Sequence, residues 1–159
     1  MTEEEIPAEA SPAFGKGPGL TGGDVGEMSP EDAVALSLID EGQKRMAEGD
    51  REGAAERFER AVAASPQQPR GYYFLAKVSL FLERPKEALA FLRKAELLFG
   101  DNAEWLGEVH ALRGAVYEEM GDEGKARPAY QRALGFSPGH LGARAGLIRL
   151  GAGDQGWGE

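Results

Sequence analysis

Residue types that commonly catalyse reactions are few in this sequence, and their spacing matches no catalytic motif. Neither of the two histidines, His110 and His140, has a second histidine or a carboxylate at a metal-binding spacing such as His-Glu-x-x-His. We expect His110 to be half exposed on a helix and His140 to lie near the start of another. Because the chain has no cysteine, thiolate chemistry, disulfides and cysteine-bound zinc are excluded. We therefore predict no metal site.

Carboxylate pairs and a glycine-rich segment are the remaining candidates for chemistry. Pairs such as Glu104–Glu108 and Glu118–Glu119 are typical of solvated helix faces, because general acid–base catalysis needs a buried carboxyl with a raised pKa. GKGPGLTGG, residues 15–23, lacks the Lys-Ser or Lys-Thr of a phosphate loop after its last glycine, and no strand is predicted before it. No serine lies in a nucleophile elbow. We predict a protein that is not an enzyme, with no catalytic residue and no cofactor.

The charge of the chain argues against nucleic acid as a partner. The net charge of the 159 residues is −9, and six acids against one lysine place −5 of it in the first thirty residues. Phosphate backbones and anionic membrane surfaces attract the opposite sign. No apolar run approaches the roughly 18 residues of a membrane span, and the acidic N-terminus does not look like a signal peptide. We expect a cytoplasmic protein; a periplasmic or lipid-anchored one is the alternative if a signal has been removed.

The sequence repeats itself. Ala47–Pro66 aligns with Glu119–Pro138, and a third, less regular copy lies between them, where Ala88, Leu92 and Ala95 match Ala54, Phe58 and Ala61. The first and second copies are one period of about 34 residues apart, and a spacing of this size is typical of a solenoid of helical hairpins. The last copy follows two such periods after the first, with four extra residues in between.

Helix start and stop signals divide the chain into seven predicted helices. Ser29 is a good N-cap and Pro30 suits the first helical position, whereas Gly49-Asp50 and Ser65-Pro66 mark a turn and an end. The predicted helices cover residues 29–48, 51–64, 70–83, 86–99, 103–120, 125–136 and 141–150. We assign the four extra residues to the start of the fifth helix. The seventh should cover the open apolar end, with one side formed by Leu141, Ala145, Leu147 and Ile148 and the other by Arg144 and Arg149.

The three units resemble tetratricopeptide repeats. The family pattern is present at Gly42, Gly49, Asp50, Ala54, Phe58, Ala61 and Pro66; at Tyr72, Leu75, Ala76, Ala88, Leu92 and Ala95; and at Gly114, Tyr117, Gly121, Asp122, Ala126, Tyr130, Ala133 and Pro138. The resemblance implies an all-α, right-handed solenoid of three hairpins, at about 35–68, 69–102 and 107–140, with a capping helix at about 141–150.

The domain should span residues 29–152, between two segments that we expect to be unfolded. Residues 1–28 are acidic and rich in glycine and proline, so they cannot bury enough apolar area to order themselves. They are a flexible linker or, alternatively, a short recognition segment that orders on a partner. Residues 153–159 should be frayed.

In the family, the first helix of each pair lines a concave groove. The matching phase implies that the groove here is lined by Leu36, Ile39, Gln43, Met46 and Ala47, then Arg70, Tyr73, Lys77, Leu80 and Phe81, then Glu108, Ala111, Ala115, Glu118 and Glu119. We expect an apolar surface with a basic rim over the first two pairs and an acidic third. The alternative for Leu36, Ile39, Tyr73 and Phe81 is that they pack inside the solenoid.

These residues favour recognition of another protein. Family members that clamp the acidic C-terminus of large chaperones carry lysine and asparagine where this chain has Ile39, Gln43, Phe74, Glu108 and Leu112. We therefore predict no carboxylate clamp, and an adaptor that binds an apolar or helical segment of a partner. Two alternatives stay open: a small secretion or assembly chaperone for an apolar export substrate, and a self-assembling scaffold that forms homo-oligomers.

Overall fold

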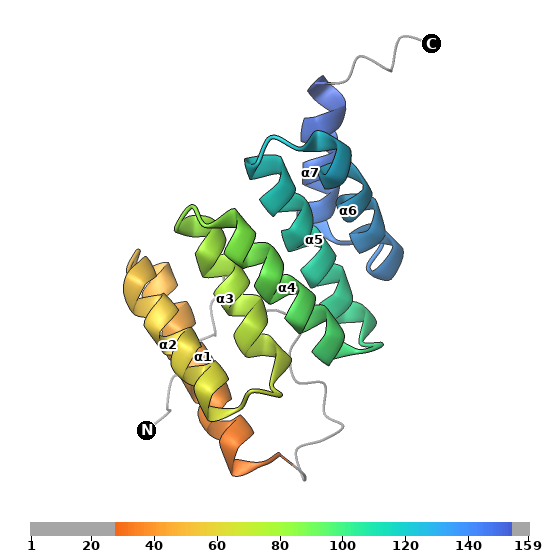
Figure 1. The fold of residues 1–159 in the computed structure, drawn as a ribbon. Helices are drawn as coiled ribbons and strands as arrows, with labels where there is room; N and C mark the ends of the chain where they lie inside the picture. The colour runs from red at the N-terminus through yellow and green to blue at the C-terminus, as the bar shows by residue number, and fades with distance from the viewer. Residues whose placement is uncertain (1–27, 154–159) are drawn as a thin grey trace, which may run out of the picture.

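A computed structural model describes residues 28–153, which form seven α-helices and, within that range, no strand. The helices are α1 (Pro30–Ala47), α2 (Arg51–Ala64), α3 (Pro69–Phe81), α4 (Pro85–Phe99), α5 (Ala103–Glu119), α6 (Glu123–Phe136) and α7 (Leu141–Gly153). They stack one after another along the molecule (Figure 1). The expected all-α solenoid is confirmed. The two segments predicted to be unfolded, residues 1–28 and 153–159, lie outside the described residues except for Met28 and for Gly153, which ends α7.

The helices pack as three hairpins and one further helix. The closest partners are α1 with α2, α3 with α4 and α5 with α6, while α2 packs on α3 and α4 packs on α5 to join the hairpins. The first helices of neighbouring pairs also touch, since α1 contacts α3 and α3 contacts α5. Helix α7 lies against α6 and α5, so it closes the third hairpin.

The repeated Gly-Asp pairs turn the chain between paired helices. Gly49 and Gly121 have φ of 83° and 75°, a left-handed conformation that glycine adopts without steric cost. Asp50 then caps α2 by accepting a hydrogen bond from the Gly53 amide at 2.9 Å, and Asp122 accepts from the Lys125 amide at 3.1 Å. The pair recurs in both copies because one residue reverses the chain and the next satisfies a free helix N–H.

Close helix contacts explain the small residues of the repeat. Any side chain at Gly42 would overlap the ring of Phe58 in α2, and one at Gly114 would overlap the ring of Tyr130 in α6. Gly146 of α7 meets the ring of Tyr130 as well. Phe58 and Tyr130 are almost fully buried by these contacts. The first and third hairpins therefore each depend on an aromatic ring lying directly against a helix backbone.

Helix α5 is longer at its start, as the sequence predicts. It has 17 residues and α3 has 13, and the repeat phase aligns the first residue of α3 with Gly107. The extra turn carries Trp105, whose ring stacks on Phe99 with centroids 4.9 Å apart and meets the edge of Tyr73 at 5.3 Å. This turn therefore fills the space between the ends of α3 and α4.

The predicted orientation of α7 is wrong for three of the four apolar residues, and Leu147 alone of them packs on the core as predicted. Leu141 is 72% exposed and Ile148 is 69% exposed, and Ala145 is exposed between them. The buried side is instead formed by Ala143, Gly146 and Leu150. The reason is the ring of Tyr130, which requires a glycine opposite it and so selects the side of α7 that carries Gly146.

We predict that the Tyr130 contact makes Gly114 intolerant of even one methyl group. Gly114→Ala should lower the free energy of unfolding by about 1–3 kcal/mol, because the ring is held between two helices and cannot move aside. Gly135→Ala is the matched control, since nothing lies within 4 Å of its added methyl group, and it should raise stability by about 0.5–1 kcal/mol. Urea denaturation of both variants measures the difference. Equal effects of the two substitutions would contradict the packing described.

Candidate functional site

The first helices of the pairs form one continuous side of the solenoid. Helices α1, α3, α5 and α7 contact one another in that order, while α2, α4 and α6 lie on the other side of the stack. We call the outward-facing residues of α1, α3, α5 and α7 the first-helix surface. It is where the sequence places the candidate groove.

The candidate residues fall into three groups in the structure. Buried residues are Ile39, Tyr73 and Ala111. Half-buried residues are Leu36, Gln43, Met46, Arg70, Lys77, Leu80, Glu108, Ala115 and Glu118, and exposed residues are Ala47, Phe81 and Glu119. For Ile39 and Tyr73 the alternative of packing inside the solenoid is therefore the one observed, and the placement of Ala111 in the groove is corrected, because it too is part of the core.

Tyr73 and Glu108 are joined in a polar cluster that also includes a residue of the last loop. The Tyr73 hydroxyl donates to Glu108 Oε2 at 3.3 Å, and His140 Nε2 lies 3.1 Å from Glu108 Oε1. His140 Nδ1 accepts a hydrogen bond from the Ala143 amide at 3.1 Å. His140 therefore caps the start of α7 with one nitrogen and pairs with α5 through the other.

The cluster shifts the pKa of its members. Accepting a bond from His140 and carrying a negative charge, Glu108 raises the pKa of His140 above its ordinary value, although burial opposes this. Burial alone would raise the pKa of Glu108, but His140, Tyr73 and Lys77 together lower it. Glu108 is therefore a charged carboxylate whose partners come from its own chain.

Glu118, like Glu108, is paired with residues of its own chain. Its carboxylate accepts from the Tyr130 hydroxyl at 2.6 Å and from Arg149 Nε and Nη2 at 2.8 and 3.1 Å. The two bonds from Arg149 are the main cause of the lowered pKa of Glu118. In the predicted acidic third of the groove, Arg149 of α7 therefore neutralises the charge of Glu118, whereas Glu119 stays exposed.

Basic residues of the first-helix surface lie over aromatic rings. The Arg70 guanidinium is 5.0 Å from the Trp105 ring centre, and Lys77 Nζ is 5.9 Å from that of Phe74. Such contacts hold a cation against the protein wall. Three apolar residues near the ends of α1 and α3 also keep accessible surface: Met46 and Leu80 are half-buried and Phe81 is exposed.

Two roles were not predicted from the sequence: the pairing of Arg149 with Glu118 and that of His140 with Glu108. The repeat phase could have indicated the place of Arg149 on this surface. Gln43, Lys77 and Ala115 occupy the same position in successive repeats, and Arg149 follows Ala115 by one further repeat period. The prediction that His110 is half exposed is wrong as well, since it is buried between α5 and α6 and its ring stacks on Phe136 at 5.5 Å.

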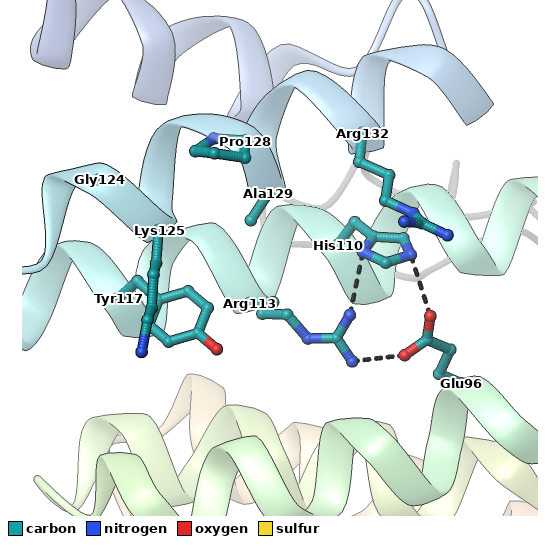
Figure 2. A pocket seen from close by; sticks show the side chains of 9 residues that line it. All are labelled: Glu96, His110, Arg113, Tyr117, Gly124, Lys125, Pro128, Ala129 and Arg132. Carbon is teal, nitrogen blue, oxygen red and sulfur yellow. Dashed lines mark hydrogen bonds and ion pairs between the residues drawn. The ribbon is translucent and has the colours of Figure 1, made fainter.

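A pocket of about 290 Å³ lies away from the first-helix surface, between α4 and α6 with α5 as its floor (Figure 2). Over residues 28–153 there is no group of three or more histidines, cysteines or acids that could hold a metal ion. Within the same range, no helix combines the length and the apolar character needed to cross a membrane.

Stacked hairpins of this kind define a helical repeat protein. Two family models described as tetratricopeptide repeat match the sequence, one at residues 45–113 and the other at residues 107–140. The chain belongs to the tetratricopeptide repeat family. The second match begins at Gly107, directly after the extra turn of α5.

Solved structures share the fold at low sequence identity. The first tetratricopeptide repeat (TPR) domain of Spaghetti (RPAP3), bound to the HSP90 peptide SRMEEVD, has a TM-score of 0.68 and 20% identity over 77% of this chain and 94% of that one. The Arabidopsis OM64 TPR domain has a TM-score of 0.69 and 18% sequence identity, over 77% of this chain and 98% of that one. MamA has a TM-score of 0.64 and 23% sequence identity, over 75% of this chain and 67% of that one. A search among curated proteins gave no match.

We predict that the two histidines titrate on opposite sides of the ordinary value of 6.5. The pKa of His140 should lie above it because of Glu108, whereas burial and the nearby Arg113 lower the pKa of His110 to about 4. Since a raised pKa stabilises the fold below it, the contribution of His140 should be complete below pH 6.5 and lost as the pH rises through its folded-state pKa. Imidazole chemical shifts against pH measure both values directly.

The control is Glu108→Gln, which removes the negative charge beside His140 and leaves His110 untouched. It should lower the pKa of His140 and not change that of His110. Two histidines that titrate together near 6.5 would contradict both the pairing of His140 with Glu108 and the burial of His110.

Proposed function

We propose that this protein is a non-enzymatic adaptor whose first-helix surface binds a short segment of another protein. The observation that carries the proposal is the strip formed by Met46, Leu80 and Phe81, where apolar side chains stay accessible on neighbouring helices. Membership of the family supports it, and so do two neighbours, the domains of Spaghetti and of human RPAP3 that are seen with HSP90 and HSP70 peptides.

Apolar contacts, rather than charge, should provide most of the affinity. Glu108 and Glu118 are already paired with His140 and Arg149, so a partner would have to replace existing bonds to reach them. Phe81, by contrast, is 37% exposed and its ring faces Arg51, 5.4 Å from the ring centre. A peptide-sized interface of this kind corresponds to a Kd of roughly 1–100 µM.

The surface also favours a partner other than an acidic C-terminal tail. Of the five places that carry lysine and asparagine in the clamping relatives, Ile39, Phe74 and Leu112 are buried here. The remaining two hold Gln43, a neutral side chain, and Glu108, which has the same charge as the ligand. A terminal carboxylate would therefore meet no cation in the expected position.

We predict that Phe81 is an energetic anchor of peptide binding. Peptides selected from a random library on the full chain should bind Phe81→Ala at least about ten-fold more weakly, a loss of about 1.4 kcal/mol, because a large apolar contact is removed. Fluorescence anisotropy of the labelled peptides measures the change. Leu97→Ala is the matched control: Leu97 is 74% exposed on α4, away from the first-helix surface, and its loss should leave the affinity unchanged.

The opposite ranking of these two variants would place the binding surface on the second helices and would end the proposal.

We predict that the HSP90 peptide SRMEEVD does not bind at concentrations up to about 1 mM, for want of a cation opposite its terminal carboxylate. The same titration with the peptide amidated at its C-terminus is the control, and it should give the same result. Binding of the free acid in the micromolar range, lost on amidation, would show that a clamp is present after all.

A further inference from the structure

Each end of the helical stack lacks a neighbouring helix among the described residues. At the last end, the side of α7 formed by Leu141, Ala145 and Ile148 is exposed, although the same side of α5 packs on α6. We call these three residues the tail surface. Leu141 is 72% exposed and Ile148 is 69% exposed, so the tail surface presents two large apolar side chains with a small residue between them.

At the first end, no described helix precedes α1. In the second repeat, Gly71 of α3 lies against Val62 of the preceding α2, and the residue of α1 in the same repeat position is Ser37. Ser37 is exposed, as are Ala33 and Val34 on the same side of the helix. We call these three residues the head surface. Its two small residues allow another helix to approach closely, and Val34, which is 52% exposed, offers an apolar contact.

The two ends carry opposite charge. Residues 30–64, which form α1 and α2, contain nine acids and five basic residues, a net charge of −4. Residues 123–153, which form α6 and α7, contain one acid and five basic residues, a net charge of +4 with His140 counted as neutral. These helices lie at opposite ends of the stack (Figure 1). One end of the molecule therefore attracts the other end of a second copy.

The charges beside the two surfaces favour the same pairing. Helix α7 has two exposed arginines, Arg144 and Arg149, and no acid. Arg149 already binds Glu118, so we assign Arg144 to the contact. Two copies joined α7 to α7 would bring these arginines together, and charge therefore disfavours a symmetrical dimer. The exposed charged residues of α1 are three acids and one base: Glu31, Asp40, Glu41 and Lys44.

We propose that copies of this chain associate head to tail, with the tail surface of one copy packed on the head surface of the next. The small residues of the head surface leave room for Ile148, and Arg144 faces the acids of α1. Because the two surfaces differ, every contact leaves one head and one tail unoccupied, and the assembly can grow. The contact does not include Met46, Leu80 or Phe81, so this inference is independent of the proposed function.

The contact should be weak and transient. Helix α7 has 13 residues and is about 20 Å long, so the interface belongs to the small class, with a Kd on the order of 0.1–1 mM. The net charge of −9 repels whole chains. At physiological ionic strength, however, exposed charges more than about 8 Å apart are largely screened, so the charges of the facing ends dominate.

Sedimentation equilibrium of the full chain measures the association. At about 0.5 mM the weight-average mass should be about 1.5 to 5 times the monomer mass of 17.0 kDa, and it should approach that mass on dilution to about 10 µM. Arg144→Glu should lower the association constant at least about two-fold. Arg93→Glu is the matched control, since it makes the same charge change at an exposed residue of α4, and it should leave the constant unchanged.

Two variants that each block one end distinguish a head-to-tail contact from a symmetrical one. Val34→Asp blocks the head surface and Ile148→Lys blocks the tail surface, each with the charge sign of its own end. Each alone should be a monomer at about 0.5 mM. Their equimolar mixture should form one-to-one dimers and nothing larger, because one intact head and one intact tail remain. Leu97→Asp is the control: Leu97 is 74% exposed on α4, and this variant should associate like the unaltered chain.

An unaltered chain that is a monomer at about 0.5 mM would overturn the proposal. A Val34→Asp chain that still dimerises alone would also overturn it, because that result indicates a symmetrical contact. Assemblies larger than dimers in the mixture, or an equal loss of association in Leu97→Asp, would place the contact elsewhere and overturn it as well.

Discussion

The contact between an aromatic ring and a helix backbone is the constraint on which this structure depends. Phe58 lies on Gly42, and Tyr130 lies on Gly114. A ring in this position brings two helices together without a layer of side chains between them, and it is buried almost completely. The first and third hairpins present the ring and the glycine in the same repeat phase, and the second hairpin has Leu92 and Ala76 at the corresponding positions.

Tyr130 connects that core contact to the surface. Its ring is held between Gly114 and Gly146, and its hydroxyl donates to Glu118, which in turn binds Arg149. Burial and the Glu118 bond together raise the pKa of Tyr130 far above its ordinary value, so the hydroxyl stays a donor. The same residue therefore fixes the position of α7 through packing and helps to hold the Glu118 carboxylate, whose charge Arg149 neutralises.

The sequence was sufficient to predict the hairpins but not the end of the stack. The repeated Gly-Asp turns and the four extra residues have local causes, so helix bounds and the longer α5 could be read from the chain. The side of α7 that faces the protein could not, because apolar periodicity selected Leu141 and Ile148, and the decisive feature was a missing side chain at Gly146. For a similar reason the sequence left Ile39 and Tyr73 open between groove and core and placed Ala111 in the groove: the repeat phase places a residue on a helix side, but burial also depends on how large its neighbours are.

The repeat phase also explains what α7 is. Leu141, Ala145 and Ile148 correspond to Gly107, Ala111 and Gly114, the side of α5 that packs on α6. Helix α7 is thus the first helix of a fourth pair, and among the described residues none covers that side. Ile148 stands where the other pairs have glycine or alanine, so a second helix could not approach as closely there as α6 approaches α5. A small residue at this position allows each complete hairpin to close, whereas the large branched side chain of Ile148 occupies the space that the second helix would need.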